Sequence, residues 1–491
     1  MKTRRLSLLC VLLVIFWLSP ARDAAPAGSI ADVTPADTLL YAEIAQPAGL
    51  WASVQETELR DAVKSSFAAE LILSFVSSTA DLFCKTLTDR SIGEAVERYG
   101  ITIGVVSAPA APSADPDIIV ILQASSHTEE LKRLLAGRVE KTLKARFPEV
   151  EITQAKIGEE DVIHIAFSRK RVWTLAFTGS CVAYGRRRAA NWLLTGGARL
   201  AERPNYKAAL EKVKRPAGPH IFCYAETTGA ASKFARFYGE GTVMSGVLEV
   251  RGQAPRRLVH DRILLSGNVQ PPRLGPAQPC RIGAVFPRGP WLVNQISFAS
   301  GGDMRGYLPI RRHARAGGAA FGRAFTGLGF LALTVETKNW LGVIAAAEVA
   351  ERDAVEAWLQ ASGFKNQAGA WCKDQSTAVI NNGYFYIGRA PVMVPLIRSL
   401  TSEKGAMLED QGDYAGRLKA LPGKAHGYSV MTSQFLLGPG CDKELLKFHE
   451  VLTGLSPSLA RAENTADGIE ITSVSPCGYG IWLVSINLAT D

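Results

Sequence analysis

The chain has 491 residues, and because a single hydrophobic core rarely grows beyond about 250–300 residues, we expect two domains. Apolar residues make up 47% of the chain and charged residues 21%, which excludes a chain that is disordered throughout. The formal net charge is +9, and residues 251–330 hold twelve Arg, no Lys and two Asp, a local excess of +10. This separation of charge favours association with anionic surfaces or polymers.

The first 27 residues have the layout of a secretory signal peptide. Basic residues precede an apolar run at residues 6–18, and small residues follow, so that cleavage after Ala21 or Ala27 fits. A retained membrane anchor is the alternative, although the 13-residue run is shorter than the ~20 residues that a span needs. We therefore expect an exported protein, periplasmic or extracellular, and keep N-terminal anchoring as the alternative.

Strands and helices mix along the first half of the chain. Alternating apolar patterns predict strands at residues 39–44, 101–106, 118–122, 150–157, 162–167, 173–185, 220–226, 247–251 and 258–265. Helical spacing of apolar residues predicts helices at residues 49–93 and 128–147 and a further helix ending near Tyr238. We expect Thr128 and the two acids that follow it to cap the start of the second helix. Seven sparse cysteines follow the signal peptide without Cys-x-x-Cys spacing, so neither a dense disulfide framework nor a zinc site is indicated.

One stretch occurs twice. Residues 173–185 and residues 377–388 each show a strand, a turn and a strand, followed by a helix. Gly185 and Gly388 are interpreted as turn glycines. Four residues recur 203 positions later, and the pairs are Thr174 with Thr377, Gly185 with Gly388, Arg186 with Arg389, and Leu193 with Leu396.

The repeat predicts an internal duplication. The expected organisation is a signal peptide at 1–27, a first copy at 28–266, a Pro/Gly-rich linker at 267–279 and a second copy at 280–491. The second copy has strands at residues 291–296, 331–335, 341–346, 377–388, 428–431, 469–474 and 481–488, and helices at 353–359 and 442–455. The predicted fold class is α+β, with each copy a largely antiparallel sheet packed with helices.

The second copy also carries an Arg/Gly-rich insert at residues 301–329, where the first copy has its apolar helices. Arginine offers paired donors to phosphate or carboxylate, and glycine lets the backbone approach closely. The insert is therefore a candidate anion-binding segment, and a solvated connection is the alternative. The candidate anion-binding residues are Arg305, Arg311, Arg312, Arg315 and Arg323.

Other motifs of chemistry are weak. No pair of histidines has a metal-binding spacing on one helix, and Gly179-Ser180-Cys181 lacks the second glycine of a nucleophile elbow. A Ser-x-x-Lys motif begins at Ser362, but Gly363 predicts a helix end there. His220 and His426 begin corresponding strands and are interpreted as structural, because no carboxylate is recognised at matched positions. We predict no catalytic, metal-binding or cofactor-binding residues, and no nucleic-acid binding.

The stretch at residues 34–44, Thr-Pro-Ala-Asp-Thr-Leu-Leu-Tyr-Ala-Glu-Ile, follows directly on the signal peptide. It resembles a family of exported bacterial proteins of unknown function, many of them from planctomycete-like bacteria, that open with a Pro-Ala-Asp-Thr turn into a strand. The resemblance covers roughly residues 30–270, and the second copy departs from it with Phe-Pro-Arg-Gly-Pro at residues 286–290. It implies bacterial export and supplies no site residues.

These observations favour a non-enzymatic extracytoplasmic binding or scaffolding protein of the bacterial cell envelope. Its expected partner is an anionic envelope polymer or a membrane surface, and its oligomeric state stays open. The alternative is a hydrolase whose scattered residues meet in a cleft between the two copies.

Overall fold

The computed structural model describes residues 29–58, 60, 85, 90–107, 117–168, 171–226, 241–252, 257–267, 274–304, 318–337, 340–402, 406–421, 423–432, 435 and 455–476. The chain divides into two compact units: unit 1 holds the described residues up to Gly267, and unit 2 holds those from Leu274 onward. The predicted segments 1–27, 227–238 and 481–488 and most of 59–89 and 442–455 lie outside the described residues.

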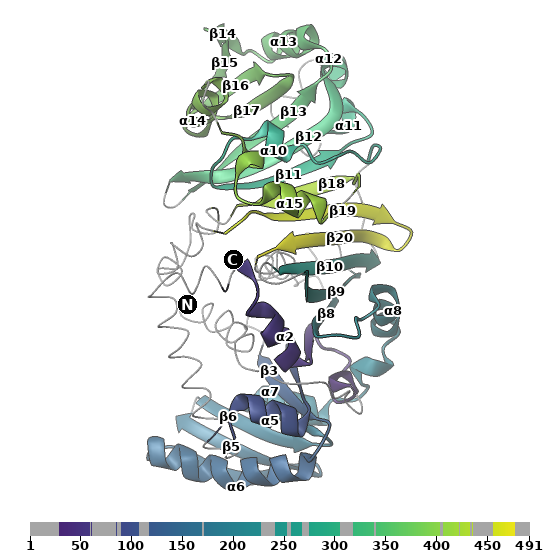
Figure 1. The fold of residues 1–491 in the computed structure, drawn as a ribbon, viewed down its shortest axis with the longest axis vertical. Coiled ribbons are helices and arrows are strands. Elements are labelled where there is room, and N and C mark those ends of the chain that lie inside the picture. The colour runs from purple at the N-terminus through teal and green to yellow at the C-terminus, as the bar shows by residue number, and fades with distance from the viewer. Residues whose placement is uncertain are drawn as a thin grey trace. The chain divides into compact units, whose positions relative to one another are not determined.

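Unit 1 is built on one antiparallel sheet (Figure 1). Its described strands run in the order β4-β5-β6-β7-β3-β2-β1-β8-β9-β10. The strands are β1 (Leu40–Ala45), β2 (Ile101–Ser107), β3 (Ile118–Ala124), β4 (Glu151–Ile157), β5 (Glu160–Ser168), β6 (Arg171–Thr178), β7 (Cys181–Arg186), β8 (His220–Glu226), β9 (Thr242–Arg251) and β10 (Leu258–Gly267).

Helices cover both faces of this sheet. On β6, Leu175 and Phe177 belong to one core and Ala176 to another, because successive residues of a strand point to opposite faces. The first core also holds Leu131 and Leu135 of the long helix that lies along β5 and β6 (Figure 1). The helical elements are η1 (Ile30–Asp32), α2 (Pro47–Val54), α5 (Ile92–Tyr99), α6 (Thr128–Arg146), α7 (Arg187–Thr195), η2 (Leu200–Glu202) and α8 (Pro204–Val213).

Unit 2 is also built on antiparallel strands. Its described strands run β14-β15-β16-β17-β13-β12-β11-β18-β19-β20. The strands are β11 (Trp291–Ser297), β12 (Phe325–Thr337), β13 (Trp340–Val349), β14 (Lys365–Gln367), β15 (Ala370–Lys373), β16 (Ser376–Asn381), β17 (Tyr384–Arg389), β18 (Gly427–Met431), β19 (Ser458–Thr465) and β20 (Gly468–Ser475). The helical elements are α10 (Ile282–Val285), α11 (Gly301–Met304), α12 (Gly318–Ala324), α13 (Arg352–Ala361), α14 (Ala390–Thr401), η3 (Leu408–Asp410) and α15 (Tyr414–Lys419).

The strands of the two units follow the same order, and the loops before the first strand of each unit make the same backbone contacts. Pro35 forms an isolated antiparallel bridge with Arg199, and Pro287 forms one with Met407. Beside these bridges the Leu200 amide donates to the Thr34 carbonyl at 2.7 Å. The Leu408 amide donates to the Phe286 carbonyl at 2.8 Å. The α+β class with antiparallel sheets is thus confirmed in each unit.

The repeated glycines do not sit in turns, contrary to the sequence interpretation. Gly185 lies in β7 opposite Ile119, and Gly388 lies in β17 opposite Ile344. A Cβ atom on Gly185 would stand 3.1 Å from Cγ1 of Ile119, and one on Gly388 would stand 2.9 Å from the Val343 carbonyl oxygen. Both glycines therefore permit a close approach of the neighbouring strand, which local sequence does not reveal.

Two further sequence predictions need correction. The closing hairpin of unit 2 consists of β19 and β20, so the predicted strand at 469–474 is its second strand, and β19 was missed. The sequence of β19, Ser-Leu-Ala-Arg-Ala-Glu-Asn-Thr, has few β-branched or aromatic residues, which explains the miss. Helix α6 is capped by His127 without a side-chain bond, while the Thr128 hydroxyl donates to the Ala124 carbonyl at 3.2 Å.

Parts of the predicted linker and insert pack into unit 2. The Gly275 amide donates to the Ser297 carbonyl, and Gln278 bridges to Ala425. Within the predicted insert, Met304 and Phe321 are fully buried in a core below α13. Among the described residues, the helices are all too short or too polar to cross a bilayer.

Replacing Gly388 with alanine should lower the free energy of unfolding by about 1–3 kcal/mol, because the new methyl group meets a backbone oxygen that has to move. Urea unfolding, monitored for each variant in the unit that carries the substitution, measures the change. The control is Gly137→Ala in α6, where a Cβ atom meets nothing within 4 Å and better helix propensity should add about 0.5–1 kcal/mol. A Gly388→Ala protein as stable as the unmodified one would contradict the packing argument.

Candidate functional site

Most of the predicted anion-binding residues lie outside the part of the chain that the structure describes. Arg305, Arg311, Arg312 and Arg315 lie outside the described residues. Arg323 is exposed on α12 and follows the buried Phe321. The structure therefore describes one of the five predicted arginines.

The described residues instead contain a polar cluster in unit 1, which begins with the segment before β1. Ser29 caps the short helix η1: its hydroxyl accepts the Ala31 amide at 3.2 Å, and its own amide donates to Asp32 at 2.8 Å. Ile30 and Ala31 are fully buried in the core. Gly104 of β2 makes room for Ile30, because a Cβ atom there would stand 2.7 Å from the isoleucine methyl group.

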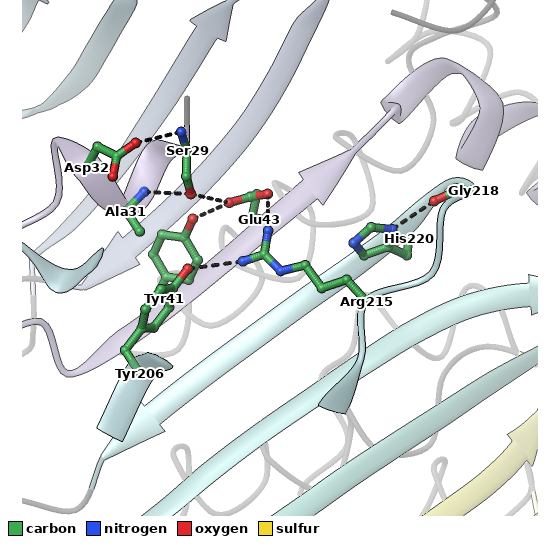
Figure 2. Close-up of polar contacts among 9 residues, drawn as sticks. All are labelled: Ser29, Ala31, Asp32, Tyr41, Glu43, Tyr206, Arg215, Gly218 and His220. Carbon is green, nitrogen blue, oxygen red and sulfur yellow. Dashed lines mark hydrogen bonds and ion pairs between the residues drawn. The ribbon is translucent and has the colours of Figure 1, made fainter. Parts of the chain in front are cut away.

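Glu43 of β1 lies at the centre of this cluster (Figure 2). Tyr41 and Glu43 point to the same face of the strand because they are two residues apart, and the phenol of Tyr41 donates to Oε2 of Glu43. The Ser29 hydroxyl donates to the same oxygen at 3.3 Å, and Nη1 of Arg215 donates to Oε1 at 2.7 Å. Three donors from three parts of the chain therefore converge on one carboxylate.

Arg215 closes the cluster from the loop after α8. Its Nη2 donates to the phenolic oxygen of Tyr206 at 3.0 Å, and its guanidinium carbon lies 4.2 Å from the centre of the Phe222 ring. The side chain of Glu43 is 7% exposed and that of Arg215 is 24% exposed, so water screens this ion pair only in part. The cluster is thus a partly buried ion pair with its hydrogen-bond partners, set in an otherwise apolar core.

The phenols of the cluster stay protonated. Burial raises the pKa of Tyr41 well above its usual value, and the negative charge of Glu43 raises it further. Burial also raises the pKa of Tyr206. Because a neutral phenol donates a hydrogen bond, Tyr41 remains a donor to Glu43 at neutral pH. The Glu43 carboxylate is thus engaged by donors from the chain itself.

His220 begins β8 at the edge of this cluster (Figure 2). Its Nδ1 lies 2.7 Å from the Gly218 carbonyl, which can only accept, so Nδ1 carries the proton of the neutral ring. Nε2 is then an acceptor, and within the described part of the chain neither Nε2 nor the nearby Nε of Arg215 has a hydrogen-bond partner. Burial lowers the pKa of His220, and the charge of Arg215 lowers it further.

Glu249 of β9 acts on His220 from the neighbouring strand, where Ile221 pairs with Leu248. Burial lowers the pKa of His220, and the negative charge of Glu249 acts in the opposite direction. The corresponding His426 instead accepts the Asn464 amide at Nδ1. Spacing along the chain does not reveal the pairing of β8 with β9 that brings Glu249 towards His220.

Unit 2 has an uncharged counterpart of the Glu43 cluster. Gln295 of β11 occupies the position of Glu43. Glu43 pairs with Phe222, two residues after His220, and Gln295 pairs with Tyr428, two residues after His426. Its Oε1 accepts the Arg281 amide at 2.7 Å and its Nε2 donates to the Pro279 carbonyl at 2.8 Å. A neutral amide therefore holds the segment before β11, whereas an ion pair holds the segment before β1.

Other side chains with potential chemistry are engaged or buried. Nδ1 of His164 lies 2.8 Å from the Thr174 hydroxyl, but Thr174 is fully buried. Ser362 ends helix α13 as predicted, so the Ser-x-x-Lys motif does not lie within one helix. Cys181 is a free, buried thiol, and burial raises its pKa to about 11, which disfavours the reactive thiolate. Among the described residues, no group of three or more possible ligands is arranged to hold a metal ion.

Comparison with known proteins identifies no relative. No family model matches the chain, and neither a curated protein nor a solved structure matches it.

Glu43→Gln should lower the free energy of unfolding of unit 1 by about 2–3 kcal/mol, because it leaves the partly buried Arg215 without its counterion. Chemical denaturation measures the change. The matched control is Glu140→Gln in α6, whose ion pair with Lys144 has side chains that are 41% and 51% exposed and should contribute under about 1 kcal/mol. Equal changes in the free energy of unfolding for the two substitutions would show that the Glu43–Arg215 ion pair contributes no more to stability than an exposed pair.

Proposed function

We propose that the protein is a non-enzymatic binding or scaffolding protein built from two units that arose by internal duplication. Support for the duplication comes from the shared strand order and the equivalent bridges at Pro35 and Pro287. Gly185 and Gly388 add to it, because each permits the same close approach at the same place in its sheet. Similar local propensity or similar composition would not by itself give the two units the same order of ten strands.

The use of Glu43 favours binding over catalysis and is the observation that carries this proposal. A general acid or base has to exchange a proton with a substrate, but the Glu43 carboxylate accepts from Ser29, Tyr41 and Arg215. This partly buried ionic cluster thus stabilises the chain itself. A partner would then contact the surface of the protein.

The proposed partner is an anionic envelope polymer or membrane surface, and the proposed location is outside the cytoplasm of a bacterium. The arrangement of residues 1–27 supports export, and the resemblance of residues 34–44 supports a bacterial origin. The arginine excess of residues 251–330 supports an anionic partner. Arg323 is exposed on α12 and is available for such a contact.

Substitution of Arg311, Arg312 and Arg315 by glutamine should weaken retention of the protein on anionic liposomes or purified cell-wall polymer. Retention of the unmodified protein should be strongest at low salt and fall as salt rises, because mobile ions screen exposed charges. A pull-down across a salt series measures both effects.

The control removes the same charge from unit 1 by changing three exposed lysines, Lys141, Lys144 and Lys207, to glutamine. If the two triple variants lose retention equally, net charge and not the arginine segment governs binding. If the unmodified protein is not retained even at low salt, the anionic partner is wrong.

A further inference from the structure

The start of unit 1 is held down by side chains from the rest of the unit. Besides the bond from Ser29 to Glu43, Nη1 of Arg199 donates to the Val33 carbonyl at 3.1 Å, and Nη1 of Arg203 donates to the Ala36 carbonyl at 2.8 Å. The Leu200 amide closes the segment by donating to Thr34. Release of residues 29–38 would therefore uncover Ile30 and Ala31, which are fully buried in the core.

His220 is close enough to act on this attachment. Glu43 pairs directly with Phe222, and His220 lies two residues before Phe222, so both ionisable side chains occupy the same face of adjacent strands. Figure 2 shows the His220 ring beside the Arg215 side chain, with Nδ1 turned towards Gly218. His220 is only 5% exposed, and its Nε2 has no hydrogen-bond partner among the described residues.

The charged groups around His220 come from three elements. Glu43 projects from β1, Arg215 from the loop after α8, and Glu249 from β9. The neighbouring helix α2, Pro-Ala-Gly-Leu-Trp-Ala-Ser-Val, contributes no titratable side chain. A proton on Nε2 would place a second buried cation beside Arg215, and the new donor would compete with Arg215 for Glu43.

We propose that His220 is a proton-sensitive switch that loosens the attachment of residues 29–38 to unit 1 when the surroundings become acidic. Protonated His220 repels Arg215 and draws on Glu43, so the carboxylate holds Ser29 and Arg215 less firmly. The segment then separates from the sheet more often while the rest of unit 1 keeps its fold.

The direction of the pH effect follows from the shift of His220. Its pKa in the folded protein lies below the value of about 6.5 for an unfolded chain, mainly because of burial. The unfolded or opened state therefore takes up a proton more readily than the closed state. The stabilising effect of neutral His220 is complete above about pH 6.5 and is lost as the pH falls towards the lowered folded value.

Unit 2 supplies an internal comparison. Gln295 holds the segment before β11 through neutral hydrogen bonds to Arg281 and Pro279. His426 accepts the Asn464 amide at Nδ1, at 3.4 Å, so its hydrogen bonding differs from that of His220. A neutral amide thus occupies in unit 2 the position that Glu43 holds in unit 1. The segment before β11 should therefore respond less to acid.

Hydrogen–deuterium exchange of the full chain, expressed as protection factors at about pH 7.5 and about pH 5, tests the switch on either side of the ordinary histidine pKa. The Leu200 amide, which bonds to Thr34, should lose about tenfold or more of its protection in acid. The Leu408 amide, which bonds to Phe286 in unit 2, should change by less than about threefold. Equal loss at both amides would overturn the proposal, since it would report general acid unfolding.

His220→Asn should remove the acid response at Leu200, because asparagine can still donate to the Gly218 carbonyl but takes up no proton. Two controls keep the assignment specific. His426→Asn removes a histidine that contacts the backbone of unit 2, and His164→Asn removes a buried histidine of unit 1. Both variants should keep the acid response at Leu200. An unchanged acid response in His220→Asn, or its loss in His164→Asn, would refute the role of His220.

Discussion

The structure of unit 1 depends on one carboxylate that is buried in a sheet and satisfied by donors from distant parts of the chain. Glu43 accepts from Ser29 at the start of the described chain, from Tyr41 on its own strand and from Arg215 beyond α8. A buried charge is costly unless it is paired and hydrogen-bonded, so loss of any of these donors should destabilise the sheet around Glu43. The interaction thereby joins the first segment to elements more than 170 residues away.

The two units use different polar contacts to hold the segment before their first strand. In both, a polar residue on the first strand reaches the segment that precedes that strand, but the residue is Glu43 in unit 1 and Gln295 in unit 2. An amide satisfies its neighbours without a counterion, whereas a carboxylate requires Arg215. The Gln295 amide does not ionise, whereas the Glu43–Arg215 pair can respond to the charge of a titratable neighbour such as His220.

Strand register explains why the candidate site was missed. Glu43 was visible as one acid within the apolar stretch at residues 39–44, two positions from Tyr41, and this spacing already placed both side chains on one face. Arg215 and Glu249 gave no such signal, because they reach Glu43 and His220 through a loop and through pairing with another strand. The repeated glycines were misassigned for the same reason, since the atoms that they accommodate belong to neighbouring strands.

Local sequence determined the elements themselves. The strand β8 spans the predicted residues, and α6 ends one residue before the predicted end, because alternation and helical spacing act over short stretches of chain. The repeat of residues 173–185 at residues 377–388 also pointed to two similar units before any coordinates were known. Only the tertiary structure decided the strand order, the partners of the buried charges and the approach of Glu249 to His220. Those features arise from contacts between residues far apart in the chain, and no local pattern encodes which distant residues will meet.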